Sequence, residues 1–232
     1  LRGRIDGIEA RMNEFEAGSF SDTTTLDGKA IFILGAVDGL PDVTAGTTET
    51  LGAGFVYQMN LNTSFTGDDN LYVRLKTGGP GPFFDTNFGV KPHSYHNETT
   101  GTTDGTIKVD KIWYTFPIGD KVTATFGPLI ENYYMMAASP SVYKPKVQKA
   151  FRFGGHGIAF GASTSVGAGL KYVGDNGFAS SVTLNSKYGG TTTGLLTKDD
   201  DTKLNLMGAY TADNYHFSAT YTTQQNGWTG GY

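Results

Sequence analysis

The chain contains no cysteine, and no stretch of it is apolar for long enough to form a membrane helix. The absence of cysteine excludes disulfide bonds and thiolate metal ligands, and it is compatible with any cellular compartment. A membrane-spanning helix needs about 20 apolar residues, and the longest apolar run, Ala30–Val37, is far shorter. A membrane β-barrel remains possible, because each of its strands carries a much weaker signal than a helix does.

Charge is also scarce, at 17% of the residues against about a quarter in an average soluble domain. The net charge of -4 gives no basic surplus, so nothing in the sequence favours binding to nucleic acid. The chain is instead rich in glycine (33 residues), phenylalanine (15) and tyrosine (13). This composition suits an all-β protein with many turns.

The first residues follow a seven-residue pattern that the rest of the chain lacks. Leu1, Ile5, Ile8, Met12 and Phe15 are spaced as the seam of a coiled coil. We therefore predict the end of a coiled-coil stalk over residues 1–19 and a linker over residues 20–25. The alternative is an ordinary amphipathic helix that packs on the rest of the protein.

From residue 26 to residue 232 the pattern has a period of two, as β-strands do. In the stretch Leu71–Thr77 the aliphatic residues Leu71, Val73 and Leu75 alternate with Tyr72, Arg74 and Lys76, so that one face is apolar and the other charged. Similar stretches recur about ten times. Several are long enough for a tilted membrane strand, which needs about nine residues or more.

Short and long connections alternate between these predicted strands. The short ones are Asp68–Asn70, Gly119–Asp120, Gly174–Gly177 and Ala212–Asn214, and the long ones are Asp38–Thr50, Gly78–Gly105, Leu129–Gly157 and Gly189–Thr202. Outer-membrane barrels have short turns at one end and long loops at the other. The pattern favours an antiparallel transmembrane β-barrel over residues 26–232. A soluble sandwich or solenoid with one wet face is the alternative.

Two stretches resemble the cyanobacterial outer-membrane porins related to the carbohydrate-selective porins. They are "IEA" (Ile8–Ala10) followed by "FSDTTTLDGKAIF" (Phe20–Phe32), and the predicted hairpin "YTFPIGDKVTATFGPL" (Tyr114–Leu129). The resemblance implies a homotrimer in outer-membrane lipid, with about sixteen strands in each barrel. It also implies a stalk and an upstream surface-layer-homology domain that grips peptidoglycan. About ten of those strands and no such domain are found here, so we expect the barrel to be incomplete at the C-terminus.

Basic residues are the candidates for lining a pore. Lys144, Lys146, Lys149 and Arg152 lie close together in the long connection after the predicted hairpin. If this loop folds into the lumen it narrows the pore, and rings of Lys or Arg at a constriction favour anions. The alternative is a solvated loop outside the barrel. Four more basic residues would add to the lining if their face is the inner one: Arg74, Lys76, Lys111 and Lys121.

Motifs for other chemistry are weak or absent. The sequence has no nucleophile motif and no phosphate-binding loop. The stretches His93–Glu98 and Lys198–Asp201 lack the ligand spacing of a metal site. The sequence therefore predicts no enzyme, no cofactor and no metal. It predicts an outer-membrane porin for passive diffusion of small hydrophilic or ionic solutes, or alternatively a stalk-tethered extracellular module for binding or adhesion.

Overall fold

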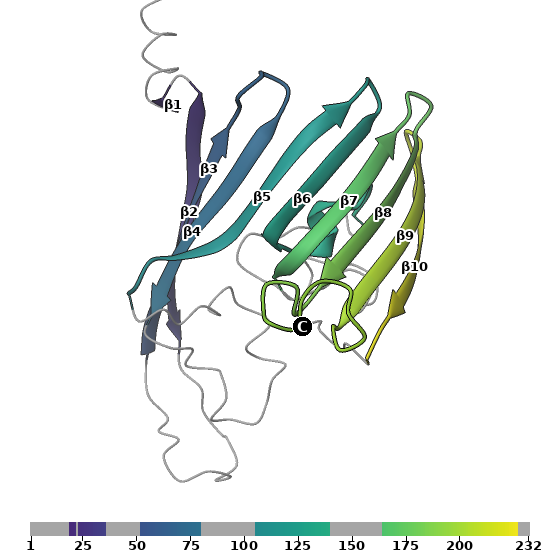
Figure 1. Ribbon diagram of the computed structural model, residues 1–232. Helices are drawn as coiled ribbons and strands as arrows, with labels where there is room; N and C mark the ends of the chain where they lie inside the picture. Colours follow the sequence, from purple (N-terminus) through teal and green to yellow (C-terminus); the bar gives the residue numbers. More distant parts are fainter. Residues whose placement is uncertain (1–18, 22, 36–51, 80–104, 140–163, 227–232) are drawn as a thin grey trace, which may run out of the picture.

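The computed structural model describes residues 19–21, 23–35, 52–79, 105–139 and 164–226 (Figure 1). All but the last residue of the predicted coiled-coil stalk, and all four residues of the predicted basic cluster at 144–152, lie outside these ranges. The described residues contain no helix that is long and apolar enough to cross a membrane.

Within the described residues, ten strands form one antiparallel sheet, in which each strand pairs with its neighbours in the chain. The strands follow one another around a curved wall (Figure 1). A 3₁₀ turn, η1 (Asn132–Tyr134), follows the sixth strand. The strands are β1 (Ser19–Ser21), β2 (Thr24–Gly35), β3 (Gly52–Thr63), β4 (Asn70–Gly79), β5 (Lys108–Ile118), β6 (Val122–Ile130), β7 (Ser165–Val173), β8 (Phe178–Ser186), β9 (Thr202–Thr211) and β10 (His216–Gln224).

Short turns join the strands at one end of the wall, the upper end in Figure 1. These turns cover residues 64–69, 119–121, 174–177 and 212–215, and they match the four short connections predicted from the sequence, except that Asn70 already begins β4. The described connection between β8 and β9, residues 187–201, lies at the opposite end, and β2, β4 and β6 end there as well. This alternation of short turns and long loops is the one found in outer-membrane barrels.

The two faces of the sheet differ sharply in charge. The inner face is the one that carries η1 and its flanking residues, and the strand register puts whole rows of side chains on it. Every charged side chain of the described strands belongs to an inner row or to the bulge beside one. These residues are Asp27, Lys29, Arg74, Lys76, Lys108, Asp110, Lys111, Lys171 and Lys203.

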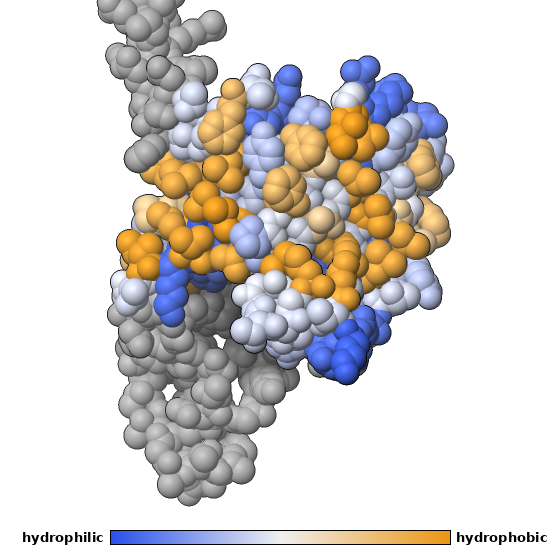
Figure 2. Space-filling model, viewed as in Figure 1, coloured by the Kyte–Doolittle hydropathy of each residue, from blue (hydrophilic) through white to orange (hydrophobic). Residues whose placement is uncertain are grey.

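The outer face is uncharged and apolar in the same strands. One outer row runs from Phe116 through Ala124, Leu170 and Val182 to Leu206. Exposed aromatic residues lie in other rows of the same face, where Phe32 and Phe217 leave 82% and 68% of their surface uncovered. Figure 2 shows hydrophobic residues across the middle of the visible wall and hydrophilic ones toward its upper rim. Such a face suits lipid better than water.

Aromatic rings gather on the outer face near the turns. Neighbouring ring centroids lie 6.4 Å apart for Phe65 and Tyr114, and 6.3 Å apart for Tyr172 and Phe178. Tyr and Trp prefer the level of the lipid headgroups, where they form the girdles of membrane barrels. The structure therefore places Leu71, Val73 and Leu75 on the lipid side of β4, and Tyr72, Arg74 and Lys76 on the inner side.

Candidate pore-lining site

The inner wall carries a segment of the chain, residues 131–139, that folds back onto it after β6. The carbonyl oxygen of Ile130 accepts a hydrogen bond of 3.3 Å from the Asn185 side chain, and the Ala137 N–H donates one of 3.0 Å to the Ser181 hydroxyl. Met136 packs against Met207. The described start of the long connection between β6 and β7 therefore lies inside the curved wall. The prediction for the basic cluster concerns residues outside the described ranges and stays a prediction.

Two glycines of β7 make room for this segment and for Ile130, the residue directly before it. A Cβ atom added to Gly169 would lie 2.8 Å from Met135 Cβ, and one added to Gly167 would lie 2.8 Å from Ile130 Cγ2. Contacts this short are not found between real side chains, so any larger residue would displace the segment. We call these two glycines, together with Asn185 and Ser181, the seat of the segment.

Four aromatic rings form a continuous cluster between the wall and the segment. The Tyr72 and Trp113 rings stack with their centroids 4.0 Å apart, Trp113 lies 4.6 Å from Tyr134, and Tyr134 lies 4.3 Å from Tyr133. Tyr72 and Trp113 are buried, whereas Tyr133 and Tyr134 are only half-buried. The two residues of the segment therefore present their rings to the interior, and the two wall residues support them.

A polar network lies beside these rings in one inner row. The strand register aligns Asp27, Asn60 and Arg74 on adjacent strands. Arg74 Nε donates a 2.9 Å hydrogen bond to Asn60 Oδ1, and Asn60 Nδ2 donates one of 2.5 Å to Asp27 Oδ1. The Tyr72 hydroxyl also donates to Asn60, at 2.7 Å, and Arg74 Nη1 donates to the Tyr134 hydroxyl at 3.2 Å. The network thus fixes the arginine beside the aromatic cluster.

Lys111 extends the same row and connects it to the segment. Its ammonium lies 3.1 Å from Glu131 Oε2 and 3.8 Å from Asp110 Oδ2, and it donates a 3.0 Å hydrogen bond to the Thr164 hydroxyl. Asp110 also lies 3.9 Å from Arg74 Nη1. Cations and carboxylates therefore alternate on the inner wall, as they would in a site that binds polar solutes of either charge.

The predicted pore residues fall into three groups. Arg74 and Lys111 belong to the cluster described above, and Lys76 lies in the next inner row, directly opposite Lys108. Lys121 lies in the turn before β6, where its ammonium is 2.5 Å from Asp175 of the next turn. The remaining predicted residues, Lys144, Lys146, Lys149 and Arg152, lie outside the described residues.

Sequence reasoning missed most of the cluster. Asp27, Asn60 and Trp113 lie on the inner face of β2, β3 and β5. The alternation of polar and apolar residues along these strands could have identified them. Glu131 and Tyr134 gave no comparable signal, because their position depends on how the segment folds back.

Asp69 organises the turn between β3 and β4. Its carboxylate accepts hydrogen bonds from the Tyr114 hydroxyl, from the hydroxyls of Ser64 and Thr66, and from the N–H groups of Phe65 and Thr66. These donors, Tyr114 foremost, hold the pKa of Asp69 well below its usual range despite its burial. The turn is therefore fixed to β5 through Tyr114.

Asp200 has the same role in the connection between β8 and β9. It is fully buried and accepts hydrogen bonds from the Ser186 and Thr202 hydroxyls and from the N–H groups of Tyr188 and Leu196. Burial acts to raise the pKa of Asp200, but these hydrogen bonds outweigh it and lower the pKa.

Among the described residues no three His, Asp or Glu side chains gather as metal ligands would. The acidic stretch Lys198–Asp201 thus contains a structural aspartate.

The family described as "Carbohydrate-selective porin, OprB family" matches residues 1–231. The chain belongs to this family. Membership confirms the predicted relationship to the carbohydrate-selective porins, a family of outer-membrane β-barrel proteins. The porins of this family are channels and not enzymes, in line with the prediction from the sequence.

Two similar proteins are uncharacterized and come from cyanobacteria. One from Nostoc is 36% identical over 125 residues, which cover 51% of this chain and 21% of that protein. One from Synechocystis is 31% identical over 145 residues, which cover 57% of this chain and 24% of that protein. The chain thus matches about a quarter or less of the length of these relatives.

The fold is similar to that of OprB from Pseudomonas putida, in a structure described as its high-pH form. The TM-score is 0.56 at 12% sequence identity, and the match covers 94% of this chain and 55% of the other. At this identity the likeness concerns the fold alone. It confirms that the ten-stranded curved wall has the architecture of a porin barrel.

Proposed function

We propose that this protein forms a passive diffusion pore for carbohydrates, and for other small hydrophilic or ionic solutes, across the outer membrane. The observation that carries the proposal is the pair of half-buried rings, Tyr133 and Tyr134, held beside the Arg74–Asn60–Asp27 network on the inner wall. Family membership supports the choice of carbohydrates.

This combination of groups matches the chemistry of a sugar. A pyranose ring has an apolar C–H face, which packs on an aromatic ring, and hydroxyl groups around its edge. The hydroxyls can donate to Asp27 and can accept from the guanidinium of Arg74, two groups that lie in one row with Asn60. Transport also requires that such binding be weak enough for release. A site open to the lumen on one side satisfies that condition, because it replaces only part of the hydration of the sugar.

We also propose that the basic cluster, Lys144, Lys146, Lys149 and Arg152, narrows the pore and attracts anions. The segment 131–139, which leads toward it along the chain, already lies on the inner face and supports this proposal. The carboxylates of Asp27, Asp110 and Glu131 would then balance the cluster, so that neutral sugars as well as ions could pass.

The proposed assembly is a homotrimer embedded in outer-membrane lipid and attached to peptidoglycan through a stalk and an upstream domain. The heptad spacing of residues 1–15 and the uncharged outer face support it. The alternative of a tethered adhesion module has no comparable support, because the chain belongs to a family of porins.

Planar-bilayer recording tests the proposed function. Purified full-length protein should give stepwise openings, in threes for a trimer, and maltotriose should reduce the current as it occupies the pore. Tyr134→Ala should weaken this block about tenfold, because it removes an aromatic ring that the sugar contacts. Tyr221→Ala, which removes an exposed ring from the outer face, is the matched control and should leave the block unchanged. Absence of openings, or equal block in both variants, would contradict the proposal.

A further inference from the structure

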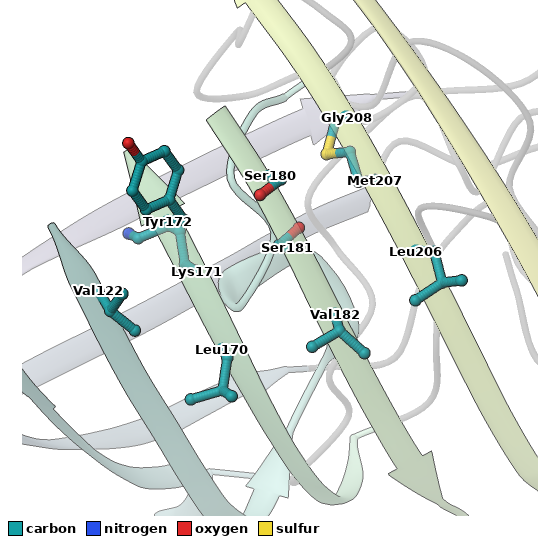
Figure 3. A pocket seen from close by; sticks show the side chains of 10 residues that line it. All are labelled: Val122, Leu170, Lys171, Tyr172, Ser180, Ser181, Val182, Leu206, Met207 and Gly208. Atoms are coloured by element: carbon teal, nitrogen blue, oxygen red, sulfur yellow. The ribbon is translucent and has the colours of Figure 1, made fainter. Parts of the chain in front are cut away.

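The outer face is hollowed between strands β6 and β9. Figure 3 shows this hollow, of about 520 Å³, with Val122, Leu170, Val182 and Leu206 on four adjacent strands around it. Leu170, Val182 and Leu206 leave between 37% and 46% of their surface uncovered. All four side chains belong to the uncharged face, so the hollow opens toward lipid and not toward the pore.

Small residues produce the hollow. Ser180 and Gly208 are opposite each other in one outer row, with Tyr172 as the next member of that row. A Cβ atom on Gly208 would meet no other atom within 4 Å, so the space above it is open. The bulkier Val182 and Leu206 of the neighbouring row form the rim.

A second hollow, of about 310 Å³, continues the first away from the turns. The two share Leu170 and Val182, and the second reaches Ala168 and Phe126 in the next outer row. Three rows of a sheet, two residues apart along each strand, span about 13 Å. The hollows therefore form one apolar furrow of the length and width of part of an extended hydrocarbon chain.

Charged groups lie at the turn end of this furrow. Lys121 directly precedes Val122 of the lining, and its ion pair with Asp175 joins the turns before β6 and before β8. Both side chains are well exposed, at 43% and 86%. Tyr172, which lies in the lining beside these turns, has the position of a girdle residue at the headgroup level.

We propose that this furrow is a binding site for one zwitterionic phospholipid, whose acyl chain lies between Leu170, Val182 and Leu206. Its phosphate faces Lys121 and its ammonium faces Asp175, so that the dipole of the headgroup lies antiparallel to that of the ion pair. A furrow that ends at a pair of opposite charges is complementary to such a lipid in shape, polarity and charge. The proposal does not depend on what the pore transports, and it gives a role to Lys121, which lies away from the inner cluster.

Native mass spectrometry tests the proposal and reports lipid and oligomeric state in one spectrum. The full-length protein, incubated with phosphatidylethanolamine in mild detergent, should retain one phospholipid per chain. Gly208→Leu fills the hollow and should lower the retained lipid about tenfold, the effect of keeping about two methylene groups out of it. Ala30→Leu enlarges an exposed outer residue of β2, far from the furrow in the strand order, and should have no effect. Ser180→Leu fills the same row and replaces Gly208→Leu if that variant does not fold.

The headgroup is tested separately. Lys121→Gln should lower the retention of phosphatidylethanolamine about threefold, which corresponds to the usual free energy of an exposed ion pair. Phosphatidylglycerol, which has no ammonium for Asp175, should bind more weakly to the unchanged protein. No retained lipid, or equal retention in Gly208→Leu and Ala30→Leu, would overturn the proposal. So would a smaller assembly in Gly208→Leu, because the furrow would then be a contact between copies of the chain.

Discussion

Lys111 on the wall and Glu131 at the start of the inward segment form an ion pair with an N–O distance of 3.1 Å. Their side chains are only 6% and 13% exposed. Because Glu131 directly precedes Asn132–Tyr134, this pair ties the half-buried tyrosines to the strand that carries Trp113. One contact thus joins the charged row, the aromatic cluster and the segment.

Replacing one member of this pair should change both stability and ion selectivity. Glu131→Gln leaves Lys111 with Asp110 as its nearest carboxylate, 3.8 Å away. We expect a loss of about 2 kcal/mol in unfolding free energy, less than for a fully isolated buried charge. The reversal potential in a salt gradient should shift toward anions, because the inner wall loses a negative charge. Asp213→Asn in the exposed turn before β10 is the control. Unchanged selectivity would show that Glu131 does not face the conducting path.

The seat of the segment can be tested with two strand glycines that lie on opposite faces of the sheet. Gly169→Ala puts a methyl group 2.8 Å from Met135 Cβ, whereas Gly208→Ala meets nothing within 4 Å. We expect Gly169→Ala to displace the segment, raise single-channel conductance and weaken block by maltotriose. Gly208→Ala should behave as the unchanged protein in both measurements. Equal conductance in a folded Gly169→Ala barrel would mean that the segment does not limit the pore.

The alternation of side chains explains how much of the fold the sequence could predict. Successive side chains of a barrel strand point alternately to lipid and to the lumen, which differ in polarity. Strand positions such as Leu71, Val73 and Leu75 therefore reveal the lipid face. The same parity places Arg74 and Lys111 on the inner wall. A bulge at Asp110 interrupts the period, yet it leaves both residues on that face.

The site itself was less predictable, for a physical reason. Tyr134 and Glu131 follow the end of β6, where no periodicity constrains the chain, and their positions depend on small residues that are distant in sequence, such as Gly169. Lys121 is a residue that the same reasoning included among the candidates for the pore although it lies in a turn. The alternation of side chains along a strand does not distinguish a residue in a turn from one in the wall. The structure pairs Lys121 with Asp175 of a different turn.

Acid should loosen the turn between β3 and β4 before the rest of the barrel. The pKa of Asp69 is lower in the folded protein than its ordinary value of 3.8, so its hydrogen bonds stabilise the fold fully above that value. This contribution is lost as the pH falls from 3.8 through the lowered folded pKa. Amide hydrogen exchange of Phe65 and Thr66, whose N–H groups bind Asp69, should therefore lose protection only in strong acid. Asp69→Asn should reduce protection already at pH 7, and the matched change Asp68→Asn should not.

The basic cluster after the inward segment gives a further prediction, about charge selectivity. Lys146→Glu combined with Lys149→Glu changes the charge of this stretch by four units. If the cluster lines the constriction, the reversal potential should move strongly toward cations at low salt, where screening is weak. Lys198→Glu combined with Lys187→Glu makes the same change in the connection between β8 and β9, where both lysines are exposed, and is the control. Equal shifts in the two double variants would mean that the cluster acts only through the general field of the protein. A shift confined to the cluster variant, together with an unchanged block by maltotriose, would separate the charge filter from the aromatic site.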